Sequence, residues 1–185
     1  MTFSIMWGIT GTGYVLKESI SLMRELQNNY DVDLTVILSK EGAAVVKWYK
    51  LWIKLTETVK KVKTEITPNI PFYAGPLQLG KYDMFLVCPV SANSVAKITY
   101  GIADTLITNC IAQAIKGGVM VYIFPSDQDL EPISTTRPDG SPLTLKIRDI
   151  EVENIKKLKV MEGINVISDF SEIKPLILKK IKVKG

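Results

Sequence analysis

Residues 3 to 26 read FSIMWGITGTGYVLKESISLMREL, and the pattern of this stretch changes twice. Phe3–Ile9 is a short apolar run that predicts a buried strand. Glycines then crowd a turn, at Gly8, Gly11 and Gly13, before apolar residues recur at helical spacing. A strand, a glycine turn and a helix in this order predict the first βα unit of an open sheet.

The same alternation continues along the chain. Further strands are predicted at residues 33–38, 84–90, 119–124 and 165–167, with a short one at 70–73. Helices are predicted at residues 41–66, 94–100, 105–116, 143–161 and 171–182. Residues 125–142 contain four prolines and predict a long irregular loop of the kind often kept for function. The sequence therefore predicts an α/β fold with a parallel sheet, in a single domain over residues 1–185.

Four loops follow the predicted strands, where ligands bind in an open parallel sheet; they are residues 10–13, 39–42, 89–94 and 125–142. Three of them place glycine or hydroxyl residues at a helix start, where free N–H groups and the helix dipole favour an anion. The first turn lacks the full dinucleotide spacing, and the second strand ends in Ser39 rather than in a carboxylate for an adenosine ribose. These features favour a mononucleotide phosphate over NAD. A turn that merely tolerates glycine is the alternative.

The third loop carries a longer motif. Residues 89–97 read PVSANSVAK, and they are followed by GIAD at 101–104 and LIT at 106–108. This run resembles the signature of the flavin-containing cysteine decarboxylase family, which carries a Pro-Ala-Ser-Ala-Asn-Thr type motif. The resemblance extends to the first glycine turn and to Ser39, so it spans roughly residues 1–124.

The resemblance implies a Rossmann-like three-layer α/β/α fold, bound FMN, and assembly as trimers or multiples of trimers. It also implies a set of FMN-binding residues, which for the phosphate are Thr10, Gly11, Thr12, Gly13 and Ser39, and for the isoalloxazine and ribityl Ser91, Ala92, Asn93 and Ser94. Thr108 falls at the end of the motif and is expected at the flavin or at a subunit contact. A helix cap is the alternative role for each hydroxyl.

The reaction of the decarboxylases is not predicted, because those enzymes use a histidine base and a Pro-Ala-Met-Asn type clamp. This chain has no histidine, and residues 125–130 read PSDQDL. The remaining likeness, to archaeal flavoproteins grouped with dihydromethanopterin reductase, implies an FMN-dependent oxidoreductase that passes electrons from ferredoxin or a similar donor to a pterin or flavin. The alternatives are an electron-transfer flavoprotein without a small substrate, and a lyase or transferase of the decarboxylase or prenyltransferase type. No catalytic residue is assigned, although Asp127 and Asp129 are candidate proton donors.

Composition excludes several other classes of protein. Hydrophobic residues make up 46% of the 185, the net charge is +4 and the lysines are dispersed, which disfavours nucleic-acid binding. No window is long and apolar enough for a membrane span, so a cytoplasmic protein is expected. The absence of histidine disfavours serine-triad hydrolysis and zinc chemistry, and no metal site is predicted. Cys88 and Cys110 lie in apolar runs and are expected as buried, reduced thiols.

Three further features have two readings each. Trp48, Tyr49 and Trp52 predict an aromatic stripe on one helix, for a core or subunit interface or for stacking against a pterin or a second flavin. Arg137 is either a solvated loop residue or a partner for an acidic substrate tail. The lysine-rich segment 179–184 is either a solvated helix end or a surface that attracts an acidic ferredoxin.

Overall fold

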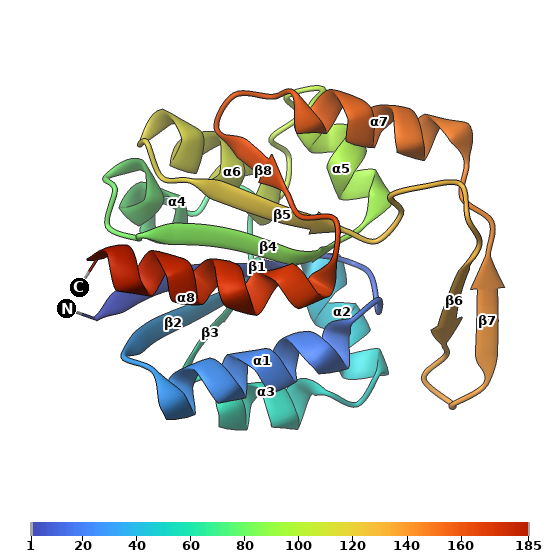
Figure 1. The fold of residues 1–185 in the computed structure, drawn as a ribbon, viewed down its shortest axis with the longest axis horizontal. Helices are drawn as coiled ribbons and strands as arrows, with labels where there is room; N and C mark the ends of the chain where they lie inside the picture. Colours follow the sequence, from blue (N-terminus) through green and yellow to red (C-terminus); the bar gives the residue numbers. More distant parts are fainter. Residues whose placement is uncertain (1, 185) are drawn as a thin grey trace.

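The computed structural model describes residues 2–184, and a six-stranded parallel sheet lies at its centre (Figure 1). Its strands lie in the order β3-β2-β1-β4-β5-β8, and every pairing between neighbours is parallel. The strands are β1 (Phe3–Ile9), β2 (Val32–Leu38), β3 (Lys61–Thr64), β4 (Met84–Val90), β5 (Val121–Pro125) and β8 (Ile164–Val166). The predicted α/β, Rossmann-like fold with a parallel sheet is confirmed.

Helices cover both faces of this sheet (Figure 1). One face packs against α1 (Leu16–Asn29), α2 (Lys40–Trp48), α3 (Trp52–Thr58) and α8 (Ile173–Lys184). The other packs against α4 (Pro71–Gln78), α5 (Ala92–Thr99), α6 (Leu106–Lys116) and α7 (Asp149–Lys159). Alternate residues of the central strands serve the two cores: Trp7 packs on the first side and Met6 on the second. Burial on both sides explains why β4 is apolar throughout.

The helix predicted over residues 41–66 is wrong: the segment forms α2, α3 and the edge strand β3. The chain turns at Lys50, whose φ of 57° lies in the left-handed region that an L residue rarely adopts. Apolar residues at helical spacing continue across this break, so periodicity alone does not reveal it. The alternating burial of Lys61–Thr64 is that of a strand at a sheet edge.

The strand predicted at residues 70–73 is also wrong. The segment belongs to α4, which begins at Pro71, in the first helical turn where the missing N–H of proline costs no hydrogen bond. Asn109 on α6 fixes the preceding loop, because its amide donates to the Pro68 carbonyl over 3.3 Å and to Asn69 over 3.2 Å.

The loop predicted over residues 125–142 contains a strand, and the helix predicted from residue 143 begins later. Strands β6 (Ile133–Thr136) and β7 (Pro142–Leu145) pair as an antiparallel hairpin, which stands away from the sheet (Figure 1). Gly140, with φ of 89°, makes its turn. Helix α7 begins at Asp149, where the Glu151 carboxylate accepts from the Arg148 N–H over 2.7 Å and so caps the helix start. The other predicted elements are present with shifted ends. No helix within residues 2–184 is long and apolar enough to cross a membrane.

Candidate functional site

The candidate site lies where β1 and β4 end side by side. From β1 the chain continues to β2 on one side of the sheet, and from β4 it continues to β5 on the other. This reversal of strand order is the place where open α/β sheets bind ligands. Thr10 joins the two strand ends: its hydroxyl donates to the Pro89 carbonyl over 3.2 Å and accepts from the Ser91 N–H over 2.8 Å.

Two neighbouring hollows open at this edge. We call the first the α2 hollow; it has a volume of about 440 Å³ and is lined by Gly11, Ser39, Lys40, Glu41, Glu65, Ser91, Asn93, Ser94, Lys97, Asp104 and Thr105. We call the second the hairpin hollow; it has a volume of about 380 Å³ and is lined by Gly11, Thr12, Gly13, Tyr14, Tyr49, Ser91, Ala92, Asn93, Ser126, Asp127, Ile133, Thr135, Leu143, Leu145, Arg148 and Glu151. Both volumes fall in the range of small-molecule sites. Gly11, Ser91 and Asn93 form a wall common to both hollows.

The glycine turn between β1 and α1 has no room for larger side chains. A Cβ on Gly11 would lie 2.8 Å from the Cβ of Glu41, and a Cβ on Gly13 would lie 2.4 Å from the ring of Tyr49. The backbone N–H groups of Gly11 and Gly13 have no hydrogen-bond acceptor among residues 2–184, whereas the Thr12 N–H donates to the Thr10 carbonyl over 2.9 Å. The turn thus presents unpaired N–H donors at the wall of both hollows, as an anion site requires.

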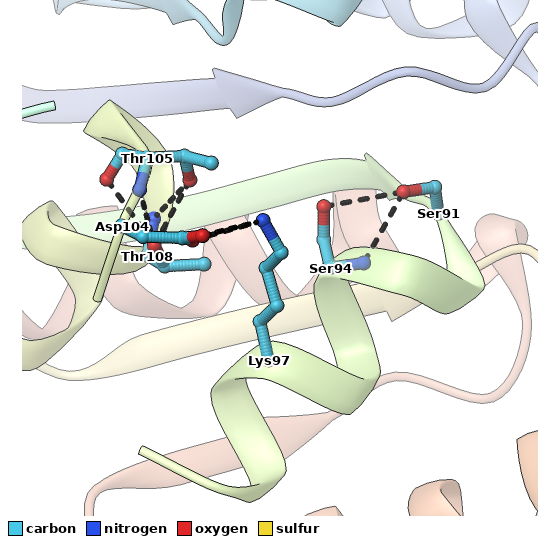
Figure 2. Close-up of polar contacts among 6 residues, drawn as sticks. All are labelled: Ser91, Ser94, Lys97, Asp104, Thr105 and Thr108. Carbon is cyan, nitrogen blue, oxygen red and sulfur yellow. Dashed lines mark hydrogen bonds and ion pairs between the residues drawn. The ribbon is translucent and has the colours of Figure 1, made fainter. Parts of the chain in front are cut away.

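Two helices begin at the α2 hollow, each with a serine cap. The Ser39 hydroxyl accepts from the Gly42 N–H over 3.0 Å at the start of α2. The Ser91 hydroxyl accepts from the Ser94 N–H over 3.4 Å and donates to the Ser94 hydroxyl over 3.1 Å at the start of α5 (Figure 2). The cap is therefore a role that both serines fill in the structure. Helix starts attract anions through the dipole and through the N–H groups left free.

Charges of both signs surround the α2 hollow. The Lys97 ammonium lies 2.9 Å from the Asp104 carboxylate, and it extends from α5 toward the start of α6 (Figure 2). The Lys40 backbone N–H donates to the Glu65 carboxylate over 3.1 Å. Because Glu41 also lines the hollow, its acidic groups outnumber its lysines. An anion here would therefore rely on backbone and hydroxyl donors more than on net positive charge.

The hairpin hollow combines an apolar wall with a polar end. Ile133, Leu143 and Leu145 of the hairpin supply the apolar wall. The Tyr49 hydroxyl at the end of α2 donates to the Thr136 carbonyl over 3.1 Å and so ties the hairpin to the body of the protein. An apolar wall with a few polar groups is the usual composition of a site for a flat heterocycle.

Asp127 is the carboxylate of this polar end. Partial burial raises the pKa of its carboxyl, and the nearby Glu151 carboxylate raises it further. The hydrogen bond from the Ser126 hydroxyl, over 2.7 Å, lowers the pKa, as do the Ala92 N–H and Arg148, but the net pKa is raised. Burial would raise the pKa of Glu151 too, but its hydrogen bonds with Arg148 outweigh burial and lower it. As the pH rises, the Glu151 carboxyl therefore loses its proton before the Asp127 carboxyl does.

Most residues predicted to bind FMN line one hollow or both; they are Gly11, Thr12, Gly13, Ser39, Ser91, Ala92, Asn93 and Ser94. Thr10 and Thr108 line neither. Thr10 is buried, and the Thr108 hydroxyl pairs with Thr105 in the capping box of α6 (Figure 2). The binding roles of all ten stay predictions.

Sequence reasoning missed several residues of the site. It did not place Lys97 or Asp104 at a hollow, and it gave no role to Arg148 or to Glu151, whose side chain caps α7 through the Arg148 N–H. Of the predicted aromatic stripe only Tyr49 lines a described hollow, and Trp48 is 65% exposed.

Comparison with known proteins defines the class. The chain belongs to the family described as Flavoprotein, whose model matches residues 1–182. It is 50% identical over 180 residues to an uncharacterized protein of Methanocaldococcus jannaschii, with 97% of each chain covered. It is also 37% identical over 145 residues to the dihydromethanopterin reductase (acceptor) of the same organism, which covers 75% of this chain but only 59% of that protein.

A solved structure gives the same picture. The chain superposes on Burkholderia xenovorans DmrB in complex with FMN, described as a cubic protein cage for redox transfer, with a TM-score of 0.81. The two chains are 28% identical, and the match covers 98% of this chain and 96% of DmrB.

Cys88 and Cys110 are free and buried, and burial raises the pKa of each thiol to about 12, so neither is a ready nucleophile.

Proposed function

We propose that the chain is an FMN-dependent oxidoreductase that reduces a pterin or a similar heterocycle with electrons from ferredoxin or a comparable donor. The observation that carries the proposal is the common wall of the two hollows, because Gly11, Ser91 and Asn93 border both. One elongated ligand with a phosphate at one end and a flat ring at the other matches this arrangement. Membership of the flavoprotein family supports FMN as that ligand.

The phosphate would lie in the α2 hollow. There the Gly11 N–H, the first turns of α2 and α5, and the Ser94 hydroxyl offer donors. The hollow has one set of such donors, and no carboxylate follows β2 at Ser39, so a mononucleotide fits better than FAD. The ring would lie in the hairpin hollow, between the glycine turn and the apolar residues of the hairpin.

When bound, FMN supplies hydride and single-electron chemistry, and the protein supplies position and shielding. The hairpin would cover a ring bound in this hollow, which favours reduction of a small substrate over electron transfer between proteins alone. The name of one relative supports a pterin, because the reductase of M. jannaschii acts on dihydromethanopterin by its name. The description of DmrB as a cage for redox transfer supports redox chemistry.

The test begins with the purified protein and its cofactor. We expect a yellow protein whose released ligand has the mass of FMN. Release of FAD, or no flavin bound after incubation with FMN, contradicts the proposal. The protein is then reduced without oxygen and mixed with a 7,8-dihydropterin, which should reoxidise it. A parallel incubation with a peptide that ends in cysteine should release no carbon dioxide, and release well above the flavin-free background restores the decarboxylase alternative.

A further inference from the structure

Asp127 occupies a position in the hairpin hollow that the proposed function leaves without a task. It follows β5 directly and lines the hollow together with the glycine turn and the start of α5. Its carboxylate accepts from the Ser126 hydroxyl over 2.7 Å, and the Ala92 N–H at the start of α5 also favours the charged form. By contrast Asp129, two residues later, is exposed, lies outside this hollow and accepts from the Glu131 N–H over 3.0 Å.

The surroundings of Asp127 favour its neutral form. Its half-buried position disfavours the carboxylate, and this is the main reason that its pKa is raised. Glu151 on α7 also disfavours the charged form of Asp127, whereas Arg148, just before α7, favours it. The guanidinium of Arg148 is itself paired with the Glu151 carboxylate over 2.6 Å. Tyr14, before α1, lines the same hollow and has a raised pKa as well, chiefly through burial, so its phenol stays neutral and adds no charge. The result is a carboxyl that retains its proton to higher pH than a free one.

We propose that Asp127 is the acid of the hairpin hollow and gives its proton to a ring nitrogen of the heterocycle that the protein reduces. This inference rests on the proposed function. In the step, the C=N bond of the heterocycle becomes CH–NH: its carbon gains a hydride from the two-electron-reduced flavin, and its nitrogen gains the proton of Asp127. The flavin ends oxidised, the carboxylate takes a proton from water, and an external reductant restores the flavin.

The chemistry needs such a donor, because a hydride added to an imine carbon leaves a strongly basic nitrogen. A positioned acid contributes about 10²- to 10⁴-fold to such a step, and its pKa works best near the operating pH. The competing role of Asp127 is structural, as a second cap on α5 through the Ala92 N–H. A cap alone affects stability, and it does not make the rate of reduction depend on the protonation of Asp127.

Asp127→Asn is the central variant and Asp129→Asn its matched control. The flavin of each protein is reduced without oxygen, and its reoxidation by a 7,8-dihydropterin is followed from pH 5 to 9. For the wild type and Asp129→Asn, we expect the rate to fall about tenfold per pH unit above the pKa of Asp127. For Asp127→Asn, we expect a rate about 10²- to 10⁴-fold lower at low pH and little dependence on pH. Ser126→Ala should move the falling limb to higher pH, because the lost hydrogen bond stabilises the carboxylate.

A second readout needs no flavin and no turnover. Carbon-13 spectra of the aspartate carboxyls in the flavin-free protein should show one group that titrates above the ordinary value of about 3.9. That signal should be absent from Asp127→Asn and present in Asp129→Asn. Its presence in Asp127→Asn overturns the proposal.

Two outcomes separate this inference from the proposed function. A wild-type protein that fails to bind FMN in a fluorescence titration refutes the proposed function itself. A wild type that binds FMN but is not reoxidised by the dihydropterin also refutes the proposed function, and the step assigned to Asp127 with it. If the wild type is reoxidised, the role of Asp127 alone is overturned when Asp127→Asn reoxidises at the wild-type rate with the same pH profile, even if the variant is less stable.

Discussion

Replacing Thr10 by valine keeps the shape of a buried side chain and removes the hydroxyl that joins β1 to the loop after β4. The Pro89 carbonyl loses the hydroxyl but keeps the Thr10 N–H at 3.2 Å. The Ser91 N–H loses its acceptor, which lay at 2.8 Å. Leaving a buried donor unpaired costs about 1 to 3 kcal/mol. Because Ser91 is only partly buried, water offsets some of this cost, and we expect a loss of about 1 to 2 kcal/mol.

Urea unfolding of the flavin-free protein measures this loss. With a slope of about 2 kcal/mol per molar urea, the midpoint should fall by about 0.5 to 1 M while the slope stays unchanged. Ser21→Ala is the control, because its exposed hydroxyl donates only to the Lys17 carbonyl of the preceding turn, and it should change stability by less than about 0.5 kcal/mol. A Thr10→Val protein with the wild-type midpoint would refute the role given to this hydroxyl.

Gly42→Ala should destabilise the protein by about 1 to 3 kcal/mol in the same urea titration, because the new Cβ would lie 2.4 Å from the Ile9 carbonyl oxygen, and a wild-type midpoint would contradict the close packing of α2 on β1. Asp127→Asn should gain thermal stability relative to the wild type as the pH rises. Because the pKa of Asp127 is raised in the native state, its carboxyl contributes stability below the unfolded-state pKa, and this contribution is lost as the pH rises through the native-state pKa. A difference in melting temperature between variant and wild type that is the same at every pH would contradict this prediction. Ser39→Ala combined with Thr10→Val should weaken FMN binding by up to several kcal/mol, measured by flavin fluorescence, because these hydroxyls hold the starts of α2 and α5 at the proposed phosphate site, and unchanged affinity would contradict that support. Light scattering at micromolar concentration should give a trimer or a multiple of trimers, and a monomer would count against that assembly.

The fold was predictable from the sequence because strands buried on both faces leave long apolar runs, unbroken in β4 and interrupted only by Ser4 in β1. The break between α2 and α3 was not, since it depends on a left-handed lysine that carries no local signal. The hairpin did leave a signal: alternating apolar residues flank Asp139 and Gly140, a common turn pair. The proline content of that segment favoured an irregular loop instead.

The candidate site was predictable only where one loop supplies its own chemistry. The glycine turn and the start of α5 each read as anion sites without reference to the rest of the chain. Tyr49 and Glu151 reach the hairpin hollow through tertiary packing, across separations that no local pattern encodes. For Asp127 the residue type was a useful signal, whereas its burial and its contact with α5 required the fold.

The wall common to the two hollows restricts how proteins built on this plan can diverge. A substitution at Gly11, Ser91 or Asn93 alters both ends of the ligand site at once, so a new substrate preference gained there risks the loss of the cofactor. Residues 126–151 contribute to the hairpin hollow and not to the α2 hollow. Mutation in that segment therefore alters the end of the site where the flavin ring and the substrate would meet and leaves the phosphate end intact, so new activities should arise by exchange of the hairpin while the phosphate site is retained.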